Sequence, residues 1–253
     1  LTDHHVRKAM SDGSVPRYSN ILKVDLKKIM IFNHQSGKIY RKVDPSFHEE
    51  IAELNKAVKR DPGYAASYDT QGNVYSRPGK QDQTLAQYTR AIEQNSNSAS
   101  AYYNRGNVYF KIGRHPEAIA DYSKAIELYS NYAMAYNNRG SAYVALGKYH
   151  EAMADYHKVI ELNPKDAVAY NNTGNVYSGL GKHHESVAQY NKAIKLNPKY
   201  AVAYNNRGSA YVDLGKYNEA LADYNKAIEL NPGNAIAYHN RGNVYSRLSK
   251  HQD

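Results

Sequence analysis

The stretch that decides the fold is YNNRGSAYVDLGKYNEALADYNKAIELNP, which runs from Tyr204 to Pro232. Nearly the same letters occur in YNNTGNVYSGLGKHHESVAQYNKAIKLNP from Tyr170 and in YNNRGSAYVALGKYHEAMADYHKVIELNP from Tyr136. Successive copies therefore begin 34 residues apart. A fixed period of this size is typical of a solenoid, in which each unit is stable because it stacks on its neighbours.

Each unit can be counted from the alanine that lies three residues before its first tyrosine. Residues 1–45 do not follow the repeat, and residues 46–64 match only the second half of a unit. Repeats 1 to 5 span 65–98, 99–132, 133–166, 167–200 and 201–234, and a truncated sixth repeat spans 235–253. The sequence thus predicts a non-repeat segment, a degenerate half repeat and an array over residues 65–253.

Every repeat predicts two helices. In the first, expected over residues 202–214 of repeat 5, the recurring Tyr, Gly and Tyr are spaced four and three apart and so share one face. Gly215 then allows the left-handed conformation that ends many helices. The second helix is expected over residues 218–230 and ends before Pro232, which cannot continue a helical hydrogen-bond ladder.

The pattern resembles the tetratricopeptide repeat family, whose fingerprint is complete in repeat 5. Its members there are Tyr204, Gly208, Tyr211, Ala220, Tyr224, Ala227 and Pro232. The resemblance covers about residues 46–253, and it implies an all-α, right-handed superhelical solenoid of antiparallel helix pairs. In that family the first helices line a concave groove that holds partner peptides.

An arginine and an aspartate occur together in several of the repeats. Repeats with arginine at the seventh residue have aspartate at the twenty-third, as in Arg207 and Asp223. Repeat 4 has Thr173 and Gln189 at these positions, so both partners are lost together. We therefore expect an ion pair between the two helices of one repeat, with a structural rather than a catalytic role.

Asparagine recurs at the fifth, sixth and ninth residues of the repeats, on the face that the resemblance assigns to the groove. Amides offer both donors and acceptors, so an array of them can bind the backbone of an extended peptide; solvated or inter-repeat amides are the alternative. The candidate peptide-binding amides are Asn73, Asn104, Asn107, Asn137, Asn138, Asn171, Asn172, Asn175, Asn205, Asn206, Asn240 and Asn243. Aromatic or apolar candidates beside them are Tyr103, Met134, Val168 and Val202.

Composition argues against several other classes of function. The formal net charge is +9, but five of the excess positive charges lie in residues 1–45, so the array lacks the basic stripe of a nucleic-acid binder. There is no cysteine, and no apolar run is long enough to span a membrane. We expect no cofactor, no metal site at His183 and His184, no catalytic residues, and by default a cytoplasmic location.

The N-terminal segment allows two interpretations. Residues 19–37 can form a helix that caps the degenerate half repeat, which the pattern favours, or the apolar runs around NHQSG can form a hairpin. A basic arm for a membrane or an acidic partner is the functional alternative.

The expected function is a non-catalytic protein-interaction scaffold that binds a peptide or partner segment in its groove through the asparagines. Two alternatives remain open at this point. Because the array stops within a repeat, it can be the substrate-recognition region of a larger enzyme. It can also be an adaptor that assembles with further copies of itself through its terminal repeats.

Overall fold

The structure is a computed structural model that describes residues 81–249, where all regular elements are α-helices. These residues belong to the compact unit that spans Ser46–Asp253. Predictions for the N-terminal segment, the half repeat, Asn73 and the end of repeat 6 lie outside the described residues.

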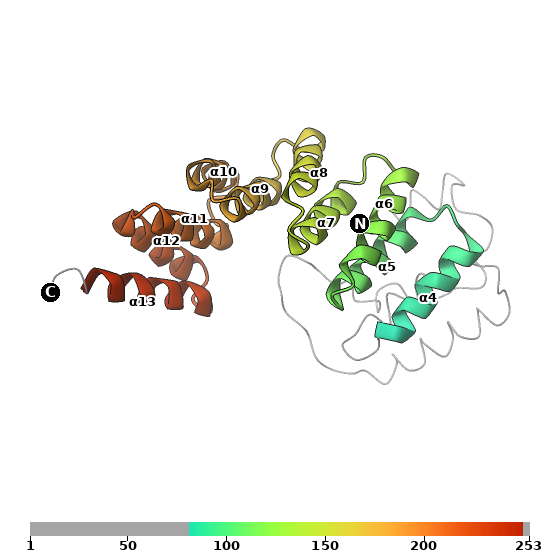
Figure 1. Cartoon of the computed structure of the whole chain (residues 1–253), viewed down its shortest axis with the longest axis horizontal. Helices are drawn as coiled ribbons and strands as arrows, with labels where there is room; N and C mark the ends of the chain where they lie inside the picture. The colour runs from blue at the N-terminus through green and yellow to red at the C-terminus, as the bar shows by residue number, and fades with distance from the viewer. Residues whose placement is uncertain (1–80, 250–253) are drawn as a thin grey trace, which may run out of the picture. The chain divides into compact units, whose positions relative to one another are not determined.

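Each fully described repeat contributes two helices that pack against each other, and successive repeats follow in chain order (Figure 1). The helices are α4 (Gln81–Gln94), α5 (Ala99–Lys111), α6 (His115–Leu128), α7 (Ala133–Ala145), α8 (Tyr149–Leu162), α9 (Ala167–Gly179), α10 (His183–Leu196), α11 (Ala201–Asp213), α12 (Tyr217–Leu230) and α13 (Ala235–Ser249). Turns of three residues join the two helices of repeats 2 to 5, which makes them antiparallel neighbours. The predicted all-α solenoid is confirmed.

The helix boundaries agree with the sequence to within one residue. In repeat 5 the helices span Ala201–Asp213 and Tyr217–Leu230, and Gly215 between them has a φ of 71°. The amide of Lys216 reaches back to the carbonyl of Tyr211 at 2.8 Å. Glycine therefore ends the first helix because it adopts a backbone conformation that other residues reach only with strain.

Proline is not required at the end of the second helix. Helix α6 is followed by Tyr129 and Ser130, where repeats 3 to 5 have Asn-Pro, yet it ends at the equivalent residue, Leu128. The residue after the helix is extended in both cases, with φ and ψ of −141° and 91° at Tyr129 and −143° and 90° at Asn163. Packing of the next repeat thus suffices to set this boundary.

The core of each of repeats 2 to 5 is a tyrosine ring lying on a glycine. A Cβ atom added to Gly208 would come within 2.8 Å of the ring of Tyr224, whose side chain is buried. Gly174 is still tighter, because its added Cβ would lie 2.5 Å from the ring of Tyr190. The tyrosine ring is thus the group that needs the space at each of these glycines. Burying such a ring stabilises each repeat by about 2 kcal/mol.

Candidate functional site

The first helices of successive repeats form the inner layer of the array. Helices α5, α7, α9, α11 and α13 each contact the next in this series, whereas no two second helices of residues 81–249 are in contact. Stacked helix pairs that approach each other through one layer only must curve towards that layer. We call the exposed side of these first helices the inner surface. The asparagines selected from the sequence within residues 81–249 lie on these same helices.

The predicted ion pair is confirmed in repeats 2, 3 and 5. The guanidinium of Arg207 donates two hydrogen bonds to the carboxylate of Asp223, at 2.6 and 2.7 Å, and both side chains are largely buried. Its remaining nitrogen donates to Asn191 of the preceding repeat at 2.6 Å, a contact that the sequence did not reveal. The hydrogen bonds that Arg207 donates to Asp223 raise the pKa of Arg207, so this cation keeps its charge. In repeat 4 the hydroxyl of Thr173 donates instead to the carbonyl of Ala169 in the same helix.

The asparagines of the fifth and sixth positions form one continuous chain of hydrogen bonds across four repeats. At each junction, the sixth-position amide donates to the fifth-position carbonyl of the preceding repeat. Within a repeat, the fifth-position amide donates to the sixth-position carbonyl over a longer distance. The donors and acceptors, in order, are Asn240 to Asn205 at 3.3 Å, Asn205 to Asn206 at 3.4 Å, Asn206 to Asn171 at 3.1 Å, Asn171 to Asn172 at 3.4 Å, Asn172 to Asn137 at 2.9 Å and Asn137 to Asn138 at 3.3 Å.

This amide chain leaves hydrogen-bonding capacity unused. Asn171 is buried, but the other members are half-buried and reach the surface. Asn172 donates one hydrogen to Asn137, whereas its amide group has two. The amides are thus neither fully solvated nor fully consumed by bonds between repeats.

The ninth position alternates between asparagine and serine from repeat 2 onwards. In repeat 4, Asn175 accepts hydrogen bonds from Tyr190 of the same repeat at 2.7 Å and from Asn206 of the next at 3.1 Å. In repeat 5, Ser209 occupies this position and lies 3.2 Å from the hydroxyl of Tyr224. Burial raises the pKa of Tyr190 to about 12, so its hydroxyl stays protonated and donates.

The apolar candidates at the second position are exposed beside the amide chain. Met134, Val168, Val202 and Ile236 have exposed fractions of 58%, 44%, 47% and 64%. These four side chains form an apolar stripe, and each is the second residue of a first helix in repeats 3 to 6. Ile236 adds a fourth member to the three named above as candidates.

The remaining predicted residues lie at the two ends of this surface. Tyr103 is half-buried on α5, where its ring stacks 4.9 Å from that of Tyr132 and its hydroxyl accepts from Asn138. Asn104 is also half-buried on α5, and Asn107 accepts from Asn138 at 2.8 Å. Asn243 is exposed on α13 and lies 3.0 Å from a ring nitrogen of His239.

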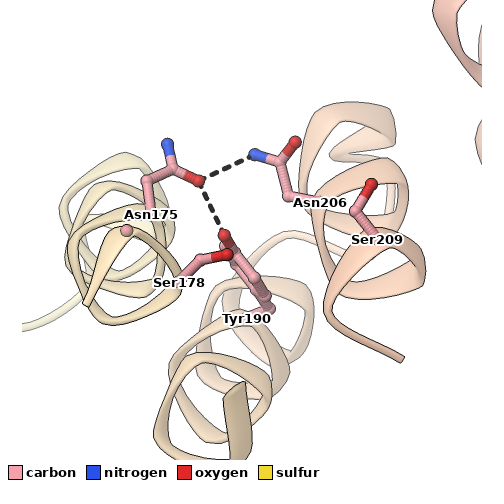
Figure 2. Close-up of a pocket in the computed structure, with 6 residues that line it drawn as sticks. Asn175, Ser178, Tyr190, Asn206 and Ser209 are labelled. Carbon is pink, nitrogen blue, oxygen red and sulfur yellow. Dashed lines mark hydrogen bonds between the residues drawn. The ribbon is translucent and has the colours of Figure 1, made fainter. Parts of the chain in front are cut away.

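A pocket of about 250 Å³ opens between α9 and α11. Figure 2 shows that the walls come from these two helices and that Tyr190 of α10 lies beneath. Its lining comprises Asn175, Ser178, Gly179, Tyr190, Asn206 and Ser209. Sequence reasoning selected only the two asparagines; the signal it missed is Gly179 beside Ser178, since the other repeats have a larger residue than glycine at the thirteenth position.

Family models place the chain among known repeats. Models described as "TPR repeat" match residues 72–113, 140–181, 174–214 and 208–249, and models described as "Tetratricopeptide repeat" match residues 99–132 and 122–154. Together they cover more than half of the sequence. The chain belongs to the tetratricopeptide repeat family. The predicted resemblance is confirmed, and the fold is one that supports protein–protein interaction.

Solved structures of other tetratricopeptide repeat proteins are similar to the chain. YrrB, described as a TPR protein with an unusual peptide-binding site, is 27% identical with a TM-score of 0.59, over 74% of this chain and 96% of its own. MamA is 29% identical with a TM-score of 0.58, over 65% and 96%. A tetratricopeptide repeat protein from Parabacteroides merdae ATCC 43184 is 25% identical with a TM-score of 0.71, over 81% and 80%. No curated protein sequence matches the chain.

Residues 81–249 contain neither a membrane-spanning helix nor a cluster of metal ligands. Among them, no helix has the length and apolar character needed to cross a bilayer. No group of three or more histidine, aspartate or glutamate side chains in this range is arranged to hold a metal ion.

Proposed function

We propose that the protein is a non-catalytic scaffold that holds an extended segment of a partner protein along its inner surface. The observation that carries this proposal is the pairing of the amide chain with the exposed apolar stripe. Amides with spare donors and acceptors suit the backbone of a peptide, whatever its sequence. Exposed apolar residues one helical turn away can contact apolar side chains of the peptide. Binding is favourable because the apolar surfaces of both are removed from water.

The relatives support the same function. YrrB, which is described as having a peptide-binding site, aligns over almost its whole length with this chain. The six residues that line the pocket carry no charge, and the apolar stripe is neutral. The guest that fits is therefore a neutral or weakly acidic segment with apolar side chains.

The experiment is a screen of the protein against an array of 15-residue peptides, followed by affinity measurements on the double variant Val168→Asp/Val202→Asp. Both valines are the second residues of their helices, where a carboxylate is favoured by the helix dipole, so folding should be unaffected. We expect binding of neutral and acidic peptides to weaken at least tenfold, because the stripe becomes charged.

The matched control places the same charges at the same helical position on the outer layer. His184 and Asn218 are the exposed second residues of α10 and α12. The variant His184→Asp/Asn218→Asp should bind as the parent does. Equal weakening in both variants, or no peptide bound by the parent protein, would contradict the proposal.

The amide contribution is tested with Asn172→Ala. Asn138 and Asn206 each donate two hydrogen bonds across a junction, whereas Asn172 donates one, so its replacement disturbs the stack least. We expect affinity to fall severalfold with little change in melting temperature. The expectations of a larger enzyme, of self-assembly, of no nucleic-acid partner and of a cytoplasmic location stay predictions.

A further inference from the structure

Two adjacent small residues, Ser178 and Gly179, line the pocket between α9 and α11. They stand where repeat 2 has Phe110 and Lys111. A Cβ atom on Gly179 would come within 2.9 Å of the ring of Tyr149 in the preceding repeat. The absent side chain of Gly179 thus leaves room for the ring of Tyr149, which is not a lining residue of the pocket. Its volume of about 250 Å³ far exceeds the share of about 30 Å³ that one water molecule takes in the liquid.

The mouth of the pocket presents one donor and one acceptor, at opposite ends of the hydrogen-bonded pair Asn175 and Asn206 (Figure 2). The carbonyl oxygen of Asn175 is occupied by Tyr190 and Asn206, so its amide nitrogen is turned away from them (Figure 2). Within the described residues this nitrogen donates to no protein atom. The carbonyl oxygen of Asn206 points to the same open side and accepts only the 3.4 Å contact from Asn205.

A fixed donor together with a fixed acceptor is complementary to a primary amide. The carbonyl of such a group accepts from Asn175, and its amide hydrogen is donated to Asn206. A carboxylate would place a second acceptor against Asn206 and would lose water without gaining an opposite charge, because no lining residue is charged. An aliphatic side chain would leave both asparagine groups unpaired.

We propose that this pocket receives the side chain of a glutamine or asparagine from the bound segment and makes the inner surface selective for it. The inference rests on the proposed function and names a ligand class for part of the same surface. Selectivity arises at the junction of repeats 4 and 5, because the two amide groups lie at the mouth of the pocket there.

The test uses the peptides bound by the parent protein and replaces each residue in turn by glutamine, glutamate and leucine. At one position, glutamine or asparagine should bind at least tenfold more tightly than glutamate or leucine. Peptide binding without such a preference would overturn this inference and leave the proposed function intact. The absence of any bound peptide would overturn both.

The decisive variant is Asn175→Asp. A carboxylate still accepts from Tyr190 and Asn206, so the stack is preserved, but the donor at the mouth becomes an acceptor. The glutamine preference should disappear. Asn107→Asp is the matched control, because Asn107 accepts the equivalent bonds from Tyr122 and Asn138 at the junction of repeats 2 and 3. A glutamine preference that survives Asn175→Asp would show that the pocket does not select the amide side chain.

A second variant fills the pocket without altering its hydrogen bonds. Ser178→Phe introduces the residue found at the equivalent position of repeat 2, and should abolish the preference for glutamine. Ser246→Phe makes the same change at the twelfth position of repeat 6, where Ser246 is exposed on α13. The control should keep the preference; its loss in both variants would point to a general effect of the added ring. Melting temperatures decide whether each variant is folded.

Discussion

The junction of repeats 2 and 3 and the junction of repeats 4 and 5 share two sets of hydrogen bonds. At each, one asparagine carbonyl, that of Asn107 or Asn175, accepts from a buried tyrosine of its own repeat and from an asparagine amide of the next. At each, an arginine of the later repeat joins an aspartate of that repeat to a polar residue of the earlier one. The two junctions lie 68 residues apart.

The residues that make these shared hydrogen bonds form a common frame. The two junctions differ in the side chains that they expose beside this frame on the inner surface. The first carries Phe110 and Lys111 on its inner surface, and the second carries Ser178 and Gly179. The residues that hold the stack together are thus separate from those that shape the surface. One can change without the other, which is what a scaffold needs in order to acquire a particular ligand.

The largest loss of stability is expected when the arginine–aspartate ion pair of the frame is removed. Asp155→Ala and Asp223→Ala each leave a largely buried guanidinium without its carboxylate, so each should lower the free energy of unfolding by about 3 kcal/mol. Chemical denaturation measures it. Gln189→Ala, at the same position of the repeat without the arginine, should cost under about 1 kcal/mol. Unequal losses at the two aspartates would show that the two frames are not equivalent.

Exchanging the surface residues tests whether the frame is neutral. The variant Phe110→Ser/Lys111→Gly gives the first junction the small pair of the second. We expect a second glutamine-selective position, with at least tenfold preference over glutamate, or about 1.4 kcal/mol. The cost in stability should be of the order of 2 kcal/mol, from the lost ring and a helical glycine. The control Lys111→Gly alone keeps Phe110 and should gain no preference.

The sequence predicted the frame well and the surface poorly. The 34-residue period sufficed for the helices, because it recurs along the array. The joint replacement of arginine and aspartate by Thr173 and Gln189 in repeat 4 sufficed for the ion pair, because the two residues change together. The third contact of each arginine, to residues such as Asn191, crosses between repeats and has no fixed residue type. The pocket is lined by Ser178 and Gly179; the glycine is a departure from the repeat, whereas serine also occurs at the twelfth position of repeat 6. Periodicity alone cannot say whether a departure leaves a space.

Removal of one hydroxyl probes the asparagine bonds at both junctions. Tyr190→Phe and Tyr122→Phe should each cost about 1 kcal/mol at neutral pH, the net value of a buried hydrogen bond. The pKa of Tyr190 is about 12 in the folded protein against about 10 in the unfolded chain. Its contribution is therefore complete below pH 10 and is lost as pH rises through 12. The parent should lose stability over this range more steeply than Tyr190→Phe, which denaturation at several pH values measures.

The smallest loss of stability is expected at Asp213, an exposed carboxylate of the second junction that has no counterpart in the first. His183 lies 3.5 Å from Asp213, whereas the residue 68 positions before Asp213 is Ala145. Because Asp213 is 49% exposed, Asp213→Ala should cost less than about 0.5 kcal/mol. Chemical denaturation measures this cost. A loss above about 1 kcal/mol would mean that Asp213 belongs to the frame. The division between a fixed frame and a variable surface would then have to be drawn further out.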